Sequence, residues 1–213
     1  MRTFAIAVVA LLSPGIAWCG CAPEKMVRIV YRDATPGINP DSFSAQPTTI
    51  YRLGSAYSRI EEAVDSENGI HGLAISAEPD SWMINLATKT GQHWIDRSPP
   101  YVVRTPIFFG PTGPAALKSF EFGCELAYMK ERGVRPQTAV IAGRSLDMYE
   151  VSEGPHRILL AVISGTERPL ATSHFKDGKP VLLLNYLQYD RGLEPDLGLF
   201  KPPAGVKVTE RTR

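Results

Sequence analysis

Histidines, cysteines and neighbouring carboxylates are the side chains of this sequence that could ligate a metal or take part in catalysis. The four histidines, His71, His93, His156 and His174, fall in separate predicted strands or turns and share no ligand spacing. Metal sites need clustered ligands. We therefore expect these residues to be strand-face histidines, with no metal site and no cofactor.

The acidic run Glu61, Glu62, Asp65 and Glu67 is the nearest approach to a catalytic pair, because paired carboxylates can hydrolyse glycosides. Adjacent residues of a strand point to opposite faces, so we interpret the run as the solvated end of a hairpin. Cys124 has no nucleophile signature around it. The sequence also contains no nucleophile elbow, no phosphate-binding glycine loop and no HExxH motif. We expect no catalytic residue and no enzyme.

The charge balance bears on the class of partner. The 213 residues include 23 basic and 22 acidic side chains, for a formal net charge of +1. Arg2 belongs to the predicted leader described below, and without it the two kinds of charge are equal. Nucleic-acid binding usually depends on a basic excess that neutralises phosphates. The composition therefore predicts no nucleic-acid partner.

The first residues have the order of a secretory signal peptide. Arg2 precedes an unbroken apolar run at Phe4–Leu12, which a Ser-Pro-Gly sequence and small residues follow. This run is shorter than the ~20 residues that span a bilayer. We expect residues 1–22 to be a signal peptide, the protein to be exported to the periplasm, and the mature N-terminus to lie between Gly20 and Pro23.

The cleavage site is open between two positions. Small residues precede a cut before Gly20 and also a cut before Ala22. A lipid-anchored form, acylated at Cys19 or Cys21, is the alternative. Trp18 disfavours it, because a bulky residue then occupies a position where small residues are expected.

The cysteines also allow two interpretations. In an oxidising compartment, Cys21 and Cys124 could form a disulfide. The simpler interpretation, which we favour from sequence, is a buried free Cys124 and a leader that removes the other cysteines.

Short runs with a period of two dominate the rest of the chain, which is typical of strands. One segment differs: apolar residues recur at spacings of three and four within residues 115–132, which predicts a helix over part of that stretch. Gly123 disfavours a continuous helix there, and strands could instead begin near Phe120. Residues 181–189 (VLLLNYLQY) are apolar on both faces, which predicts a central strand. We expect one mainly β domain at residues 23–213, with an antiparallel sheet and one helical insert. The other predicted strands are 27–32, 48–53, 57–62, 71–77, 82–86, 92–96, 138–142, 144–151, 157–164 and 169–175.

The C-terminal segment 196–208 contains an acidic residue, a phenylalanine, paired prolines and a Gly-Val. In this it resembles the terminal segment of the LolA-like family of periplasmic lipoprotein carriers, which sort lipoproteins to the outer membrane. The preceding residues 175–189, the pair 50–52 and 57–60, and the strand 82–86 are also similar to that family.

The resemblance implies a strongly curved antiparallel half-barrel, with a helix covering the concave face and an apolar cavity for the acyl chains of lipoproteins or lipids. It places Arg52 where the carriers hold an arginine that latches the lid. Alternation puts Trp82, Ile84 and Leu86 on one face, and we expect them, with Arg52, to form the ligand-binding set. The alternative is an envelope sensor or scaffold of the same fold that binds a protein partner. We expect a monomer in either case.

Overall fold

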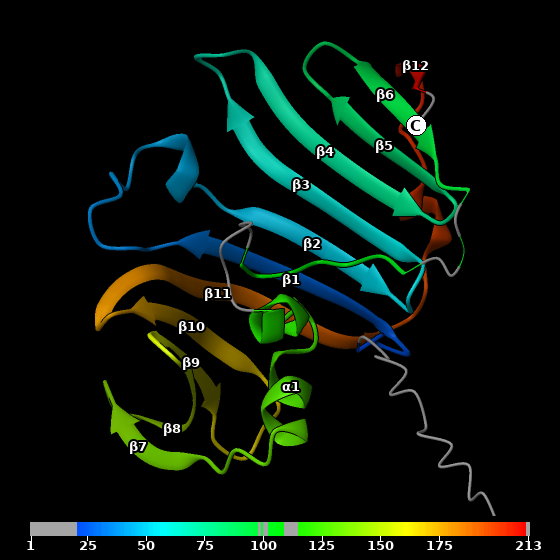
Figure 1. Ribbon diagram of the computed structural model, residues 1–213. Helices are drawn as coiled ribbons and strands as arrows, with labels where there is room; N and C mark the ends of the chain where they lie inside the picture. Colours follow the sequence, from blue (N-terminus) through cyan, green and yellow to red (C-terminus); the bar gives the residue numbers. More distant parts are fainter. Residues whose placement is uncertain (1–20, 98, 100–101, 109–114, 212–213) are drawn as a thin grey trace, which may run out of the picture.

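The computed structural model describes residues 21–97, 99, 102–108 and 115–211. The strands form one open sheet in the order β12-β6-β5-β4-β3-β2-β1-β11-β10-β9-β8-β7 (Figure 1). All neighbours pair antiparallel except β12, which is parallel to β6. Over these described residues, a mainly β architecture with a predominantly antiparallel sheet and one α-helix is therefore confirmed. The elements are β1 Met26–Asp33, η1 Phe43–Ala45, β2 Thr48–Leu53, β3 Tyr57–Asp65, β4 Ile70–Ala77, β5 Asp80–Asn85, β6 Thr90–Ile95, η2 Ala115–Ser119, α1 Glu125–Glu131, β7 Gln137–Ile141, β8 Arg144–Glu153, β9 His156–Ile163, β10 Pro169–Lys176, β11 Lys179–Leu193, η3 Leu197–Phe200 and β12 Lys207–Arg211.

Tight turns that the sequence marks locally connect many of these strands. Between β10 and β11, Asp177 and Gly178 both have positive φ, at 51° and 74°. Positive φ at both central residues is the requirement of a type I′ hairpin turn, which Asp-Gly sequences satisfy well. The turn sets the register of the hairpin, in which Lys176 lies opposite Lys179.

The helix predicted within residues 115–132 is present only in part. η2 is a short 3₁₀ turn, α1 is a separate helix of seven residues, and Gly123 between them has a φ of 85°. The break has a tertiary cause, because Glu121 forms a β-bridge with Pro106 from the preceding loop. Side-chain periodicity carries no information about that contact.

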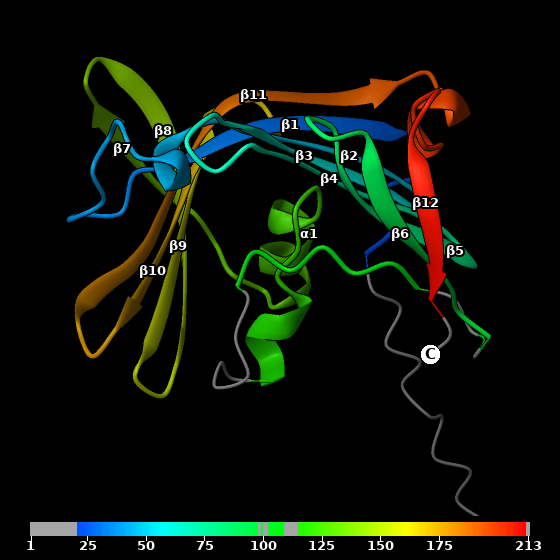
Figure 2. The same ribbon diagram turned by 90° about the horizontal axis from the view of Figure 1, so that it is seen from above.

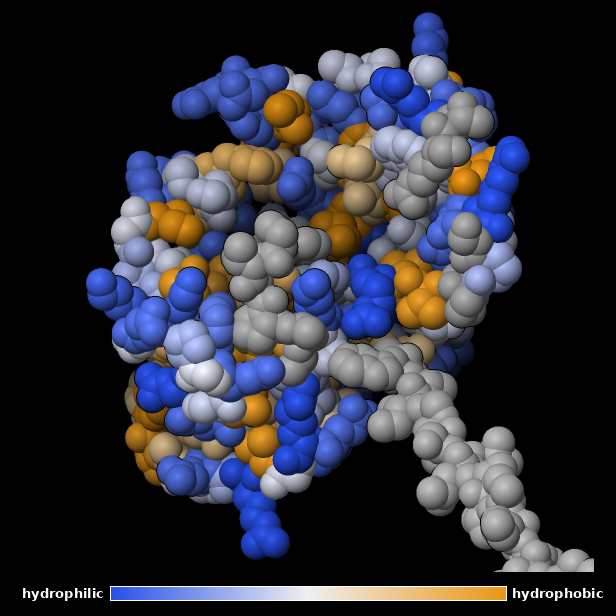
Figure 3. Space-filling view, in the orientation of Figure 1, coloured by the Kyte–Doolittle hydropathy of each residue, from blue (hydrophilic) through white to orange (hydrophobic). Residues whose placement is uncertain are grey.

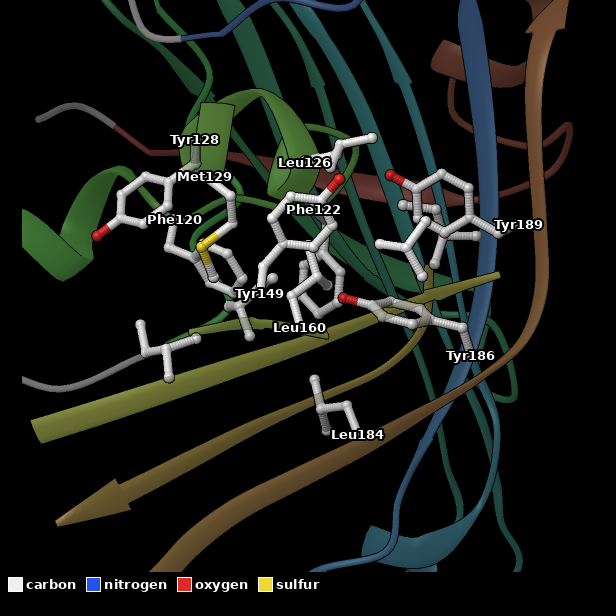
Figure 4. Packing of buried hydrophobic residues seen from close by; sticks show 14 of the residues in the cluster. Phe120, Phe122, Leu126, Tyr128, Met129, Tyr149, Leu160, Leu184, Tyr186 and Tyr189 are labelled. Atoms are coloured by element: carbon white, nitrogen blue, oxygen red, sulfur yellow. The ribbon is translucent and has the colours of Figure 1, made fainter. Parts of the chain in front are cut away.

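The sheet is bent into an arch, and α1 lies inside it (Figure 2). We call the described parts of the connection between β6 and β7, residues 102–108 and 115–136, the insert. Aromatic and aliphatic side chains of the insert fill the space between α1 and the concave face (Figure 4). Burial of each large apolar side chain contributes about 1.5–3 kcal/mol. This first core includes Val27, Ile29, Ile50, Phe120, Phe122, Leu126, Met129, Leu160, Leu184, Tyr186 and Tyr189.

The convex face carries a second core beneath the C-terminal tail, residues 194–206. Phe200 of η3 is 1% exposed and packs in one cluster with Ile84. Arg59 of β3 donates a hydrogen bond to the carbonyl of Leu199 at 3.2 Å. The tail therefore closes the outside of β3–β5, while the insert occupies the inside of the arch.

The prediction for residues 181–189 is half right. β11 lies between β1 and β10, as a central strand, and Leu184 and Tyr186 are buried against the insert. Its other face is not covered, since Val181 and Leu187 are 45% and 47% exposed. The apolar residues on that side do not reach a second layer, because the tail leaves β11 and crosses β3–β5 instead.

Candidate functional site

The insert covers only part of the concave face, and an open groove lies beside it over β3–β6. Directly paired residues of neighbouring strands share a face, so cross-strand rows can be followed through the register. One row runs from the first core into the groove. Its exposure rises from 0% and 1% at Ile29 and Ile50, through half-buried Ile60 and Ala74, to 63% at Met83.

Small side chains lower the floor of this groove. On β4 the small residues Gly72 and Ser76 share the face of Ala74, with Ile70 at the end of the strand, and β5 adds Ser81 beside Ser76. A Cβ at Gly72 would lie 2.1 Å from Oε2 of Glu62, so the carboxylate of Glu62 reaches over Gly72. The result is a trough along β4 between larger side chains of β3 and β5.

A pocket of about 420 Å³ occupies the outer end of the groove. That volume is within the range of small-ligand sites, about 300–1,000 Å³. The space-filling view of this face is hollowed above the insert, and apolar side chains show in the hollow (Figure 3). The pocket is lined by Glu62, Ile70, Gly72, Met83, Ile84, Asn85, Thr90, Gly91 and Gln92.

The three residues expected to line the cavity share one face, but it is the convex one. Trp82 and Leu86 pack with Ile84 in the second core, and Ile84 is only 4% exposed. Met83, between them, has its side chain on the groove side. Alternation of the side chains shows which residues of this strand share a face. It does not show which of the two faces is open, because that depends on where the tail packs.

Arg52 lies on the concave face at the junction of sheet and insert and is 2% exposed. Its Nη1 donates to the carbonyl oxygen of Phe122 at 2.5 Å, and its Nη2 lies 3.1 Å from Oε2 of Glu121. Nη2 also donates to the carbonyl oxygen of Cys21 at 3.3 Å. Burial lowers the pKa of the guanidinium, and the charge of Glu121 opposes that shift. Arg52 therefore fastens the insert and the N-terminal segment to the sheet, and it does not line the pocket.

A second polar contact holds α1. Glu125 is fully buried and accepts hydrogen bonds from the hydroxyls of Tyr186 at 2.9 Å and Tyr189 at 2.5 Å, both from β11. Burial raises the pKa of Glu125, and the two hydroxyl donors partly offset that rise. The insert is thus attached through carboxylates that bond to the sheet as well as through apolar packing.

A disulfide joins Cys21 to Cys124 at the start of α1. This overturns the interpretation of Cys124 as a free buried thiol. It also places Cys21 inside the folded domain, two residues ahead of the predicted start at Pro23. A thiol used in this bond is not available for acylation, whereas Cys19 lies outside the described residues. The cysteine count of the sequence allowed this pair. The cleavage site of the leader had to be known before the sequence could decide whether Cys21 remains to pair with Cys124.

Two histidines meet at one end of the arch, which their sequence positions did not indicate. Nδ1 of His156 lies 2.9 Å from Nε2 of His174, whose ring also packs against Phe108 of the insert. Burial, with the nearby charge of His156, lowers the pKa of His174. Within the described ranges, no group of three or more His, Cys, Asp or Glu side chains is placed to hold a metal ion.

His93 holds the last strand to the sheet. Its Nε2 lies 2.7 Å from Oδ1 of Asp80 and its Nδ1 lies 2.9 Å from Oε1 of Glu210 on β12, while its ring stacks on Trp82. Burial lowers the pKa of His93, but the hydrogen bonds and charges of Glu210 and Asp80 outweigh it, and the net pKa is raised.

Because the folded pKa is raised, His93 contributes stability that is complete below the unfolded pKa of about 6.5 and is lost as pH rises through the folded value. We expect His93→Gln to lower the melting temperature by about 3 °C at pH 6, equivalent to ~1 kcal/mol, and by less at pH 9. Thermal unfolding followed by circular dichroism at both pH values measures this. In an Asp80→Asn background the pH-dependent part of the difference should shrink. An equal loss at both pH values contradicts the assignment.

Fold and groove together define a class: an open, strongly curved, predominantly antiparallel sheet whose concave face is covered by an insert on one side and open on the other. In the part of the chain that the structure describes, every helix is too short or too polar to cross a membrane. No protein-family model matches the chain. A search of the curated proteins gives no match either.

Solved structures do show similar folds. An uncharacterized conserved protein from Thermus thermophilus is similar over 88% of this chain and 91% of its own, with a TM-score of 0.51 and 12% identity. Two crystal forms of PNGF-II match 89% and 88% of this chain, with 13% and 12% identity and TM-scores of 0.37 and 0.36. This chain spans only about a third of PNGF-II, 32% and 31% in the two forms. The first similarity concerns fold alone, and the TM-scores of the second pair are too low to support an argument.

Proposed function

We propose that this protein is an exported binding protein that holds acyl chains of lipids or lipoproteins in the groove over β3–β6, with a fold of the LolA-like type. The observation that carries the proposal is Met83. It is a large apolar side chain on the third strand from one edge of the sheet, 63% exposed, beside a trough of small residues and an open pocket. Exposed apolar concavities of this kind are typical of ligand or partner sites.

The driving force would be burial of methylene groups, at about 0.8 kcal/mol each. The row from Ile60 to Met83 offers apolar contacts that continue directly from the core. The site differs from the one implied by the family resemblance, because the space beneath α1 is filled by aromatic side chains. The ligand would lie beside the insert, on the part of the concave face that the insert leaves open.

Two further features support the proposal. The disulfide between Cys21 and Cys124 fits export to an oxidising compartment, in line with the predicted signal peptide. Arg52 contacts the covering segment, as the arginine of the carriers does in the family resemblance. Its bonds to the insert suggest that it regulates access to the concave face without touching the ligand.

Replacing Met83 with aspartate tests the groove directly. We expect binding of a fluorescent monoacylglycerol, which has a neutral head group, to weaken at least tenfold, since loss of contact with about two methylenes accounts for that factor. Stability should change little, because Met83 is exposed in the unliganded protein. Fluorescence titration measures the affinity.

Val140→Asp is the matched control, since Val140 is an exposed strand residue on β7, far from the groove in the sheet order. It should bind the probe like the wild-type protein. Folded wild-type protein that shows no saturable binding of the monoacylglycerol would refute the acyl-binding proposal.

The second candidate is a scaffold that binds a protein partner. The observation that favours it is the outer edge of the sheet, where Val140 and Ile141 of β7 are 75% and 49% exposed. An edge strand with exposed apolar residues can accept a strand from another chain. This candidate predicts that Val140→Asp abolishes binding of an envelope protein, while Met83→Asp leaves it unchanged.

A further inference from the structure

The strand β12 gives the groove a charged border. β12 pairs in parallel with β6, so its side chains alternate between the faces defined by β6. Lys207 lies opposite Thr90 and Arg211 lies opposite Trp94, both on the groove side of β6. Glu210 lies opposite His93 on the convex side, where the two side chains bond. Alternation thus separates the charges of this strand: the bases face the groove and the acid faces away.

These two bases are free to contact a ligand. All residues of β12 are exposed, and neither Lys207 nor Arg211 makes an ion pair or side-chain hydrogen bond with another described residue. The acidic residue that lines the pocket, Glu62, belongs to β3, and its carboxylate reaches over Gly72 of β4. From β4 to β12 is three strand spacings, ~14 Å at about 4.8 Å each. Screening is strong beyond ~8 Å at physiological salt, so Glu62 offsets the charge of this border only weakly.

We infer that the groove takes amphiphiles with an anionic head group, a carboxylate or a phosphate, with the acyl chain over Ala74 and Met83 and the head group at Lys207 and Arg211. The inference rests on the proposed acyl-binding function and adds the chemistry of the ligand. The geometry fits it, because the row Ile60–Ala74–Met83–Gln92–Thr209 runs across the strands and ends between the two bases. Arg and Lys both bind such oxygens through charge-assisted hydrogen bonds.

The experiment compares two probes that share a chain length and differ in head-group charge, dodecanoate and dodecyltrimethylammonium, by isothermal titration below their micelle concentrations. We expect the wild-type protein to bind dodecanoate about tenfold more tightly, with an affinity that falls as salt rises. The double variant Lys207→Gln/Arg211→Gln should lose that preference and the salt dependence.

The matched control is Arg144→Gln/Lys179→Gln, which removes two exposed bases from the far half of the sheet and should keep the preference. The charge-preserving pair Lys207→Arg/Arg211→Lys should keep it too, which separates charge from any structural effect on β12. Retained melting temperatures show that the variants are folded.

Each outcome has a distinct meaning. Equal binding of both probes overturns the inference of an anionic head group, and so does a preference that survives Lys207→Gln/Arg211→Gln. Either result leaves the proposal of acyl binding intact. If the wild-type protein binds none of the three probes, the two charged ones and the neutral monoacylglycerol, the proposed function is overturned as well. If inorganic phosphate or acetate binds as tightly as dodecanoate, the site is one for free anions. That result would overturn the inference that the ligand is an amphiphile.

Discussion

Replacing Arg52 with methionine is expected to lower the free energy of unfolding by about 3–5 kcal/mol, a large part of the stability of a typical domain. The substitution leaves the carbonyl of Phe122 without its donor and removes one of the cations that face Glu121. Both groups are buried: the carbonyl is left unsatisfied, and Glu121 keeps only its contact with Arg104 at 2.6 Å, so its charge is less well compensated. Urea denaturation followed by tryptophan fluorescence measures the loss.

Arg59→Met is the control for this prediction. Arg59 pairs with Glu61 and bonds to the carbonyl of Leu199 on the convex face, where both side chains of the ion pair are partly exposed, so its loss should cost less, about 1–2 kcal/mol. In the double variant Arg52→Met/Glu121→Gln, the effects should be less than additive, because the carboxylate that Arg52 neutralises is then gone. An unchanged denaturation midpoint in Arg52→Met would show that the insert is held by apolar packing alone.

Removing the disulfide through Cys21→Ala/Cys124→Ala is expected to lower stability by about 2–5 kcal/mol. The bond spans 103 residues, and closing a long loop restricts the unfolded chain strongly. Thermal unfolding of the variant and of the wild-type protein, with and without dithiothreitol, measures the effect. The reduced wild-type protein should match the variant, since both lack the cross-link.

A thiol assay gives an independent check on the same bond. Native protein should show no reactive thiol at Cys124 after unfolding in the absence of reductant. Identical melting temperatures for oxidised and reduced protein would contradict a stabilising disulfide.

Features fixed by neighbouring residues could be predicted from the sequence. The strand pattern, the Asp177-Gly178 turn and the central place of Leu184 depend on local periodicity and turn geometry. The broken helix could not be predicted, because Glu121 leaves the helical path to bridge Pro106.

The candidate site was predictable only to the level of the strand. Trp82 and Ile84 lie on a strand that borders the groove but on its covered face, since alternation is symmetrical and says nothing about which side the tail packs. The signal that would have pointed to the groove was the small-residue alternation of Gly72, Ala74 and Ser76 on β4. The burial of Arg52 depended on Glu121, far away in the chain, and no local pattern encodes it.

The place of β1 in the sheet has a consequence for how the chain folds. β1 is hydrogen-bonded to β2 on one side and to β11 on the other, so that Met26 near the start of the domain pairs with Leu193 near its end. Contacts between residues so distant in sequence slow folding, because loop-closure entropy is lost before the contact is gained. Until β11 has been synthesised, β1 presents an unpaired edge in the middle of the future sheet. The two halves of the sheet can therefore join only after β11 is available, and a chaperone that shields β1 during that interval would raise the yield of folded protein.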